Sequence, residues 1–275
     1  MQDQQPAAPR RAYADTRLGQ MNLHLWPGPA TAGAATVVCL HPIPYSGRYF
    51  DAFAAELSQH CSVVAPDLVG YGSSAELAEP ATLEDHAAAV ADALQDQGIA
   101  RYMPLGFHTG SAVAGELALA RPTRVERRAF ITYPLLDEDE RAKQLHGLGR
   151  TPLSGEDLQC LSRRWRFTVN SRAAGVPLDR ALVNFTEELR AGDKAWFGFH
   201  SMFSYKPEER LPKIGQPTLV LNIEGSLKDA TRAAAELLPA PSYNEFSSMS
   251  RGIFELHAGK LAAAIHSFLE AELDD

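Results

Sequence analysis

The sequence predicts an α/β fold, with a mostly parallel, twisted β-sheet covered by helices on both faces. Apolar, β-branched segments alternate with segments of helical periodicity, and the connections between them are short. Residues 35–42 (ATVVCLHP) form a continuous apolar run, which is typical of a strand buried on both faces of a parallel sheet. The chain has 275 residues, which fits one such domain with an insertion.

The expected elements follow one another along the chain. Thr82 and Asp85 have the spacing of a capping box and predict the start of a helix. The strand at 101–107 runs into the helix at 109–120 with almost no loop, so the two elements meet in a sharp turn. Further strands are expected at 21–26, 35–42, 61–67, 126–134, 216–223 and 242–248, and further helices at 49–60, 82–97, 227–238 and about 258–273.

Two segments depart from this alternation. Residues 1–15 are polar and contain proline, and we expect a disordered N-terminal arm. Residues 136–211 have no buried-strand pattern and are rich in Arg, Glu, Trp and Phe, so we expect a helical lid inserted between two strands. The α/β core then comprises residues 16–135 and 212–275. An insertion at the carboxyl edge of a parallel sheet covers the crevice in which ligands bind.

The overall composition limits the possible partners. The formal net charge of −8 argues against nucleic-acid binding, which needs clustered Lys and Arg. The three cysteines, Cys39, Cys61 and Cys160, lack the spacing of a zinc site, and no phosphate-binding loop is visible, so we expect no metal and no cofactor. The sequence has no apolar run of membrane-spanning length and no secretory signal at its start. We expect a cytoplasmic protein that binds a small molecule, and a homodimer is left open.

Five motifs occur in a characteristic order and resemble the α/β-hydrolase superfamily over residues 20–273. The turn between strand and helix resembles a branch with G-[FY]-H-T-G in place of G-x-S-x-G. The resemblance implies the fold predicted above, with a reactive site at the carboxyl edge of the sheet. The motifs are LHPIPYSGRYFDAF (40–53), APDLVGYGSS (65–74), PLGFHTGSAVAGELALARP (104–122), PTLVLNIEGSLKDATRAAAELLP (217–239) and NEFSSMSRGIFELHAGKLAAAIHSFL (244–269).

The resemblance identifies residues 106–110 (GFHTG) as the nucleophile elbow, with His108 at its tip. An imidazole there can act as a general base, as a nucleophile or as a hydrogen-bond partner of the substrate. In the family, the residue after the nucleophile supplies a backbone N–H to the oxyanion hole, which implies this role for Thr109. The following helix is expected to lower the pKa of His108. The second donor is expected near Ile43, although Pro42 replaces the usual glycine.

The other two triad positions are also altered. The resemblance puts Ser226 at the acid position and Arg251 at the histidine position. Glu224 is a substitute acid, and Arg251 is expected to clamp a carboxylate or enolate, or to pair with Glu224, unless it is merely structural. Asp137 is a second candidate acid, with a solvated acidic loop as the alternative. His257 is a structural residue at a helix entrance or a displaced catalytic residue.

A further group of residues is expected to contact the substrate. Aromatic lids often line pockets for apolar ligands, although the lid aromatics could instead form a core of their own. In the family, the histidine after the third strand supports the oxyanion loop, which is the role implied for His41. The predicted substrate-binding residues are His41, Ile43, Ser226, His200, Trp165 and Trp196.

Three functions are compatible with these residues. The favoured hypothesis is a cofactor-independent enzyme in which His108 is the general base, and Thr109, Arg251 and Glu224 complete the catalytic group. Lyase, cyclase or isomerase chemistry, or water-mediated ester or lactone hydrolysis, of an apolar organic substrate would all suit it. The second is a conventional hydrolase with Thr109 or Ser111 as nucleophile. The third is an inactive ligand-binding protein that has kept the fold, because fold alone does not define function.

Overall fold

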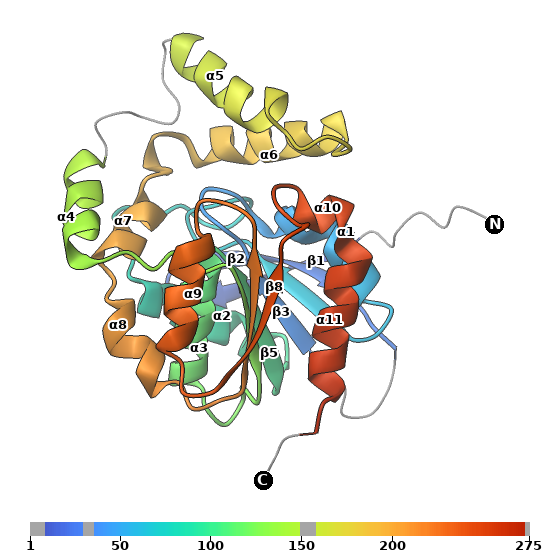
Figure 1. Cartoon of the computed structure of the whole chain (residues 1–275). Helices are drawn as coiled ribbons and strands as arrows, with labels where there is room; N and C mark the ends of the chain where they lie inside the picture. Colours follow the sequence, from blue (N-terminus) through green and yellow to red (C-terminus); the bar gives the residue numbers. More distant parts are fainter. Residues whose placement is uncertain (1–8, 30–35, 149–157, 273–275) are drawn as a thin grey trace, which may run out of the picture.

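In the computed structural model, which describes residues 9–29, 36–148 and 158–272, the chain forms an α/β-hydrolase fold around an eight-stranded sheet (Figure 1). The strand order is β1-β2-β4-β3-β5-β6-β7-β8, and β3 to β8 run parallel. This confirms the predicted fold class. The strands are β1 (Arg10–Thr16), β2 (Gly19–Trp26), β3 (Thr36–Leu40), β4 (Val63–Pro66), β5 (Tyr102–Phe107), β6 (Arg128–Ile131), β7 (Thr218–Ile223) and β8 (Pro241–Phe246).

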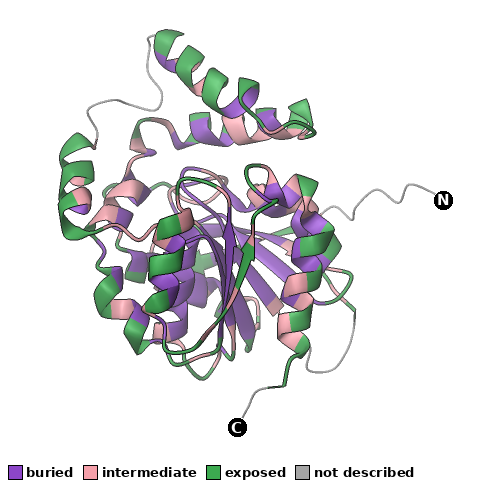
Figure 2. Ribbon diagram, viewed as in Figure 1, coloured by how far each residue is buried: buried purple, intermediate pink, exposed green. Residues whose placement is uncertain are grey.

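Helices cover both faces of the sheet, and each face has its own apolar core (Figures 1 and 2). One face carries α2 (Leu83–Asp96), α3 (Thr109–Ala120) and α9 (Lys228–Glu236). The other carries α1 (Asp51–Leu57), which follows the short helix η1 (Gly47–Phe50), and α10 (Ile253–Leu256) and α11 (Ala258–Glu270). Thr82 and Asp85 form the predicted capping box of α2.

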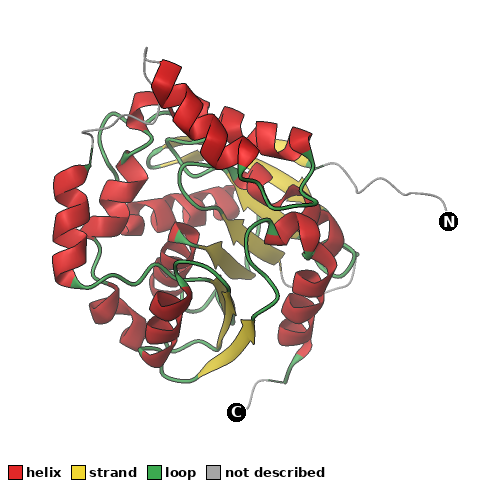
Figure 3. Ribbon diagram, turned by 45° about the horizontal axis from the view of Figure 1, so that its top comes forward, coloured by secondary structure: helices red, strands yellow, loops and turns green. Residues whose placement is uncertain are grey.

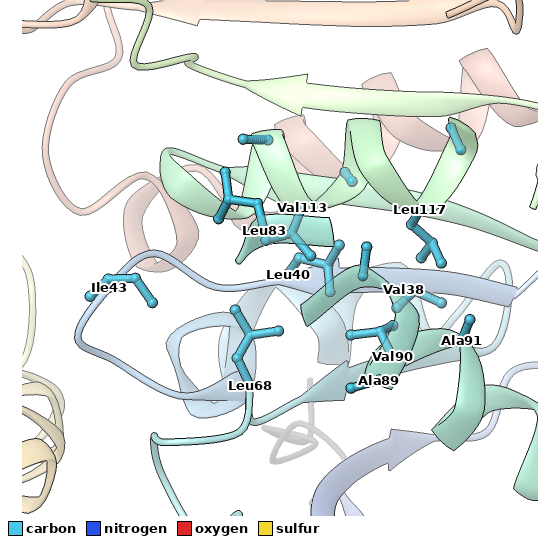
Figure 4. Close-up of a cluster of buried hydrophobic side chains, with 14 of the residues drawn as sticks. Val38, Leu40, Ile43, Leu68, Leu83, Ala89, Val90, Ala91, Val113 and Leu117 are labelled. Atoms are coloured by element: carbon cyan, nitrogen blue, oxygen red, sulfur yellow. The ribbon is translucent and has the colours of Figure 1, made fainter. Parts of the chain in front are cut away.

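The central strands are buried along their whole length, as their apolar runs predict. Figure 4 shows one side of this core, where Val38 and Leu40 of β3 lie among side chains of α2 and α3, such as Val90 and Val113. All three cysteines are buried. Tight packing on both faces fixes the carboxyl ends of the strands, where the site lies.

The first strand corrects the prediction of a disordered arm over residues 1–15. Residues 10–16 form β1, which pairs with β2 as an antiparallel hairpin from Arg10 opposite Leu25 to Thr16 opposite Gly19. The strand is held by backbone hydrogen bonds at the sheet edge, and in it only Ala14 is buried, so its polar composition gave little sign of it. Residues 1–8 lie outside the described part of the chain.

The segment between β6 and β7 is helical and strand-free over its described residues. Helices α5 and α6 pass over the carboxyl edge of the sheet (Figures 1 and 3). The elements are α4 (Glu138–Gly147), α5 (Leu158–Trp165), η2 (Arg166–Asn170), α6 (Leu178–Ala191), η3 (Gly192–Lys194), α7 (Phe197–Ser204), α8 (Pro207–Arg210) and η4 (Leu211–Lys213). In the described residues, no helix is both long and apolar enough to cross a membrane.

Candidate active site

A cavity of about 540 Å³ lies between the carboxyl edge of the sheet and the lid. The sheet side contributes residues from the ends of β5, β6 and β7, from the segment between β3 and α1, and from the segment after β8 that includes α10. The lid side contributes residues of α5, η2, α6 and α7 and of the loop between η2 and α6. Apolar walls with a few polar groups are typical of small-molecule sites. The residues of the sheet side used below are Ile43, Tyr49, His108, Thr132, Glu224 and Arg251.

His108 lies at the tip of the turn between β5 and α3 and lines this cavity. Its backbone has a φ of 52° and a ψ of −119°, a strained conformation for a residue with a side chain. The turn requires glycine on both sides. A Cβ atom at Gly106 would lie 2.2 Å from the carbonyl oxygen of Gly110, and one at Gly110 would lie 1.9 Å from that of Leu40. The elbow predicted from residues 106–110 is therefore present.

The His108 imidazole is neutral because burial lowers its pKa to about 4. The lower pKa agrees with the sequence-based expectation, but its cause is loss of hydration. The ring packs against Phe107, with the ring centroids 4.1 Å apart. Within the described ranges, no side chain forms a hydrogen bond with the ring, so no carboxylate orients it as in a serine-hydrolase triad.

Thr109 is the first residue of α3, so its backbone N–H has no acceptor within the helix. Ile43 also lines the cavity, between Pro42 and Pro44, which have no N–H of their own. The role of the Thr109 and Ile43 amides as oxyanion donors stays a prediction.

The hydroxyls of the elbow helix do not face the cavity. Ser111 is fully buried, and its Oγ donates a hydrogen bond to the Thr132 carbonyl oxygen at 2.8 Å. Thr109 is also buried and does not line the cavity. A nucleophilic role for Thr109 or Ser111 therefore has no support in the geometry.

The altered triad positions lie at the cavity but do not form a relay. Ser226 lines the cavity. Glu224 lines it too, but its carboxylate accepts a hydrogen bond from Lys228 Nζ at 2.5 Å. Arg251 donates from Nη2 to the Phe167 carbonyl oxygen at 3.1 Å, and its guanidinium lies 5.0 Å from the centroid of the Phe167 ring. The predicted pairing of Arg251 with Glu224 is therefore wrong, because each group has another partner.

The two remaining candidates for the relay have structural positions. Asp137 is the N-cap of α4 and accepts a hydrogen bond from the Glu140 N–H at 2.8 Å, outside the cavity. His257 lies at the junction of α10 and α11 and does not line the cavity. The structural alternative fits His257, whereas the acidic residues after Asp137 begin helix α4 and do not form the loop given as the alternative for Asp137.

His41 braces the loop after β3 and does not reach the cavity. The ring is fully buried; Nδ1–H donates to the Pro42 carbonyl oxygen at 3.0 Å, and Nε2 accepts from the Leu68 N–H at 2.9 Å. Both ring nitrogens are thus occupied, and burial lowers the pKa of His41 to about 4. The prediction that His41 binds substrate is corrected to a supporting role, as the family resemblance implied.

Three predicted lid contacts lie elsewhere. His200 lines a separate cavity of about 370 Å³, next to Ser201 and Lys206. Trp196 packs edge-on against His200 and Phe197, and Trp165 packs edge-on against Phe185 in the lid itself, so neither tryptophan lines the main cavity. These predictions failed because helical periodicity identifies apolar positions without saying which surface they face. The lid aromatics that do line the cavity are Phe167 and Phe199.

The sequence analysis also missed residues that line the cavity. Tyr49 stacks on Phe107 with a centroid separation of 5.7 Å. Thr132 follows β6 directly, and its place at the carboxyl end of a parallel strand was a usable signal. Arg172, in the lid, had no comparable signal. In the described residues, no group of three or more His, Cys, Asp or Glu side chains could hold a metal ion.

A family model described as "Alpha/beta hydrolase family" matches residues 37–268, most of the chain. The chain belongs to the α/β hydrolase family. Two curated relatives share part of the sequence. They are the "Putative carbamate hydrolase RutD" of Yersinia enterocolitica, 36% identical over 116 residues, and the "Lipase LipV" of Mycobacterium tuberculosis, 37% identical over 114 residues. Each match covers 42% of this chain and less than half of the relative, namely 42% of RutD and 43% of LipV.

Two solved structures have a similar fold over nearly the whole chain. A hydrolase from Pseudomonas aeruginosa has a TM-score of 0.77 at 20% identity, with 96% of this chain and 100% of the other covered. An enol-lactonase from Burkholderia xenovorans has a TM-score of 0.74 at 17% identity, with 94% and 100% covered. At these identities the likeness extends to the fold alone.

Proposed function

We propose that this protein hydrolyses an ester-type acyl bond of a small organic substrate, such as an ester, a lactone or a carbamate, by activating water with His108. The observation that carries the proposal is the neutral imidazole at the tip of the elbow, lining the cavity. The names of the two sequence relatives support hydrolysis in preference to lyase, cyclase or isomerase chemistry.

The proposed reaction needs no side-chain nucleophile. His108 takes a proton from water while the water oxygen attacks the substrate carbonyl carbon. The carbonyl π electrons move to the carbonyl oxygen. This oxygen accepts one hydrogen bond from the Thr109 N–H, at the start of α3, and one from the Ile43 N–H, in the loop after β3. The tetrahedral intermediate then collapses, the acyl bond to the leaving group breaks, and His108 returns the proton to that group.

The absence of a carboxylate partner shapes this mechanism. An isolated buried imidazolium is unfavourable, which is consistent with the pKa of about 4 for His108. In the reaction the imidazolium forms together with the oxyanion, and the two opposite charges stabilise each other in a medium of low dielectric constant. The developing oxyanion of the substrate therefore makes it easier for His108 to accept a proton. Glu224 has no part in this scheme because it is paired with Lys228.

The test is hydrolysis of 4-nitrophenyl pentanoate and of dihydrocoumarin by the purified protein and its variants. His108→Ala is expected to lower kcat by about 100-fold or more. Ser111→Ala is the matched control, because Ser111 lies in the same elbow helix but outside the cavity, and it should retain turnover. A wild-type kcat/KM that is constant at neutral pH and falls as the pH drops toward about 4, while circular dichroism shows that the protein is still folded, would support the imidazole as the base.

Two results would contradict the proposal. Full turnover by His108→Ala would exclude the imidazole as the base. Covalent labelling of Thr109 or Ser111 by a serine-directed phosphonate would establish a conventional nucleophile. If the wild type shows no turnover on either probe and on longer esters, while binding them, the protein is a ligand-binding member of the family.

A further inference from the structure

The charged side chains of the main cavity are unevenly paired. Two carboxylates line it, and each has a cation as partner. Glu224 pairs with Lys228, and Glu255 accepts from Arg180 Nε at 3.0 Å. Each of these cations is shared with a second carboxylate, because Lys228 also pairs with Glu245 and Arg180 also pairs with Asp51.

Three arginines line the same cavity, and only one has a carboxylate partner. Arg164 forms an ion pair with Glu188 at 2.6 Å. Arg172 donates from Nε to the Val176 carbonyl oxygen at 3.0 Å and from Nη1 to that of Val169 at 2.9 Å. These acceptors carry no formal charge. Over the described residues, Arg172 has no carboxylate within ion-pair distance.

Arg251 is the second unpaired cation. Its hydrogen bond goes to the Phe167 carbonyl oxygen, and its guanidinium lies over the Phe167 ring. Among the described residues it also lacks a carboxylate within ion-pair distance. Within the described residues, Nε and Nη1 of Arg251 have no protein acceptor, because only Nη2 donates to Phe167. A planar guanidinium with free N–H groups matches the geometry of a carboxylate.

These two unpaired arginines line one cavity of a chain whose net charge is −8. Both side chains are exposed, whereas His108 is partly buried. We propose that the substrate carries a carboxylate that binds Arg251 and Arg172 at the open part of the cavity, with its scissile bond toward His108. This rests on the proposed function only for the position of the scissile bond.

Binding tests the carboxylate site without any turnover. Isothermal titration of the full chain with 4-phenylbutyrate and with 4-phenylbutyramide compares a carboxylate with a neutral group of similar shape. The carboxylate should bind about tenfold more tightly, which is the scale of one hydrogen bond between charged groups. Arg251→Gln and Arg172→Gln should each reduce this preference, and the double variant should abolish it. Arg163→Gln is the matched control, because Arg163 is exposed on α5 outside the cavity and should leave the preference intact.

Turnover separates this inference from the proposed function. Mono-4-nitrophenyl glutarate should have a lower KM than 4-nitrophenyl pentanoate, and the difference should disappear in Arg251→Gln. Selective binding of the carboxylate without hydrolysis would leave the anion site valid and contradict the hydrolase. Equal affinity for 4-phenylbutyrate and its amide would overturn the anion site, whatever the esterase activity. So would a preference that survives in the folded double variant, with folding checked by circular dichroism.

Discussion

His108 and Thr132 lie side by side at the carboxyl ends of β5 and β6, and both have a left-handed backbone, with φ values of 52° and 56°. They are the only residues other than glycine with a positive φ in the described ranges. Thr132 is fixed by its neighbours: its N–H donates to the Leu221 carbonyl oxygen at 3.0 Å, and its own carbonyl oxygen accepts from Ser111 Oγ. Such strain costs about 1–3 kcal/mol at each residue and is common at functional sites.

Thr132→Val should leave the free energy of unfolding unchanged or raise it by about 1 kcal/mol. The Thr132 hydroxyl is buried and has no hydrogen-bond partner in the described residues, and valine has the same shape without the polar group. Urea unfolding measures the change. The control is Thr231→Val, which should cost about 1–3 kcal/mol because Thr231 Oγ1 accepts from the Tyr133 N–H and donates to the Leu227 carbonyl oxygen. A clear loss of stability in Thr132→Val would reveal a structural hydrogen bond of its hydroxyl.

Gly110→Ala should lower the free energy of unfolding by more than about 3 kcal/mol, or prevent folding. The added methyl group would collide with the backbone of β3, which cannot move away as a flexible side chain can. Gly259→Ala, in α11, is the matched control because nothing lies within 4 Å of its Cβ position. There the stability should be retained or increase by up to about 1 kcal/mol. Thermal unfolding of both variants measures these changes. A Gly110→Ala protein as stable as the wild type would mean that the elbow and β3 are not in close contact.

Stability should fall as the pH drops from about 6.5 to about 4. His41, His86 and His108 each have a pKa of about 4 in the folded protein, because burial disfavours the imidazolium, whereas the ordinary value is 6.5. In this interval the unfolded chain binds more protons, so each histidine lowers the free energy of unfolding by up to about 1.4 kcal/mol per pH unit. Above pH 6.5 these three groups add no pH dependence.

Urea unfolding at pH 7, 6 and 5 measures this slope, and His86→Leu provides the comparison. The His86 ring is buried, and within the described residues its Nδ1 has no hydrogen-bond partner, so leucine removes the proton uptake without breaking a bond to that atom. The variant should have a shallower slope than the wild type. Equal wild-type stability at pH 5 and pH 7 would show that these imidazoles are not kept neutral by folding.

Arg180→Met should loosen helix α6 from the core. Arg180 donates to Glu255, to Asp51 Oδ2 at 3.1 Å and to the Arg48 carbonyl oxygen at 2.5 Å, so one side chain links the lid to α1 and α10. Hydrogen exchange of the α6 amides should become faster, with a loss of about 1–3 kcal/mol in local stability as two partly buried carboxylates lose their partner. Arg190→Met, on the same helix, removes only one exposed hydrogen bond to the core, from Arg190 Nη2 to Ser73 Oγ at 3.2 Å, and should have a smaller effect. Unchanged exchange in Arg180→Met would mean that apolar packing alone holds α6.

The fold was predictable from the sequence because its strongest signals are local. The buried strands are apolar throughout, the capping box of α2 needs only Thr82 and Asp85, and the elbow needs only two glycines around its tip. Strand β1 was missed because an edge strand can be polar on most of its surface. The strand is recognised by its pairing with β2, and the composition of residues 10–16 does not reveal this pairing.

The site was less predictable because its contacts join segments far apart in the chain. His108 and Ser226 were placed correctly at the cavity, since each directly follows a sheet strand or its short loop. The lid side failed, as Phe167 lines the cavity and Trp165 does not, although both are aromatic and two residues apart. The stacking of Arg251 on Phe167 likewise depends on how the lid docks. The left-handed backbone of Thr132 leaves no trace in the residue type.

The elbow keeps its geometry although the side chain at its tip is an imidazole. Gly106, Gly110 and the packing of α3 on β3 impose the turn, and none of these depends on the chemistry of residue 108. The backbone of the turn therefore directs the side chain at its tip toward the cavity, whatever that side chain is. We expect a different side chain at position 108 to face the same cavity, because the glycines that shape the turn would be unchanged.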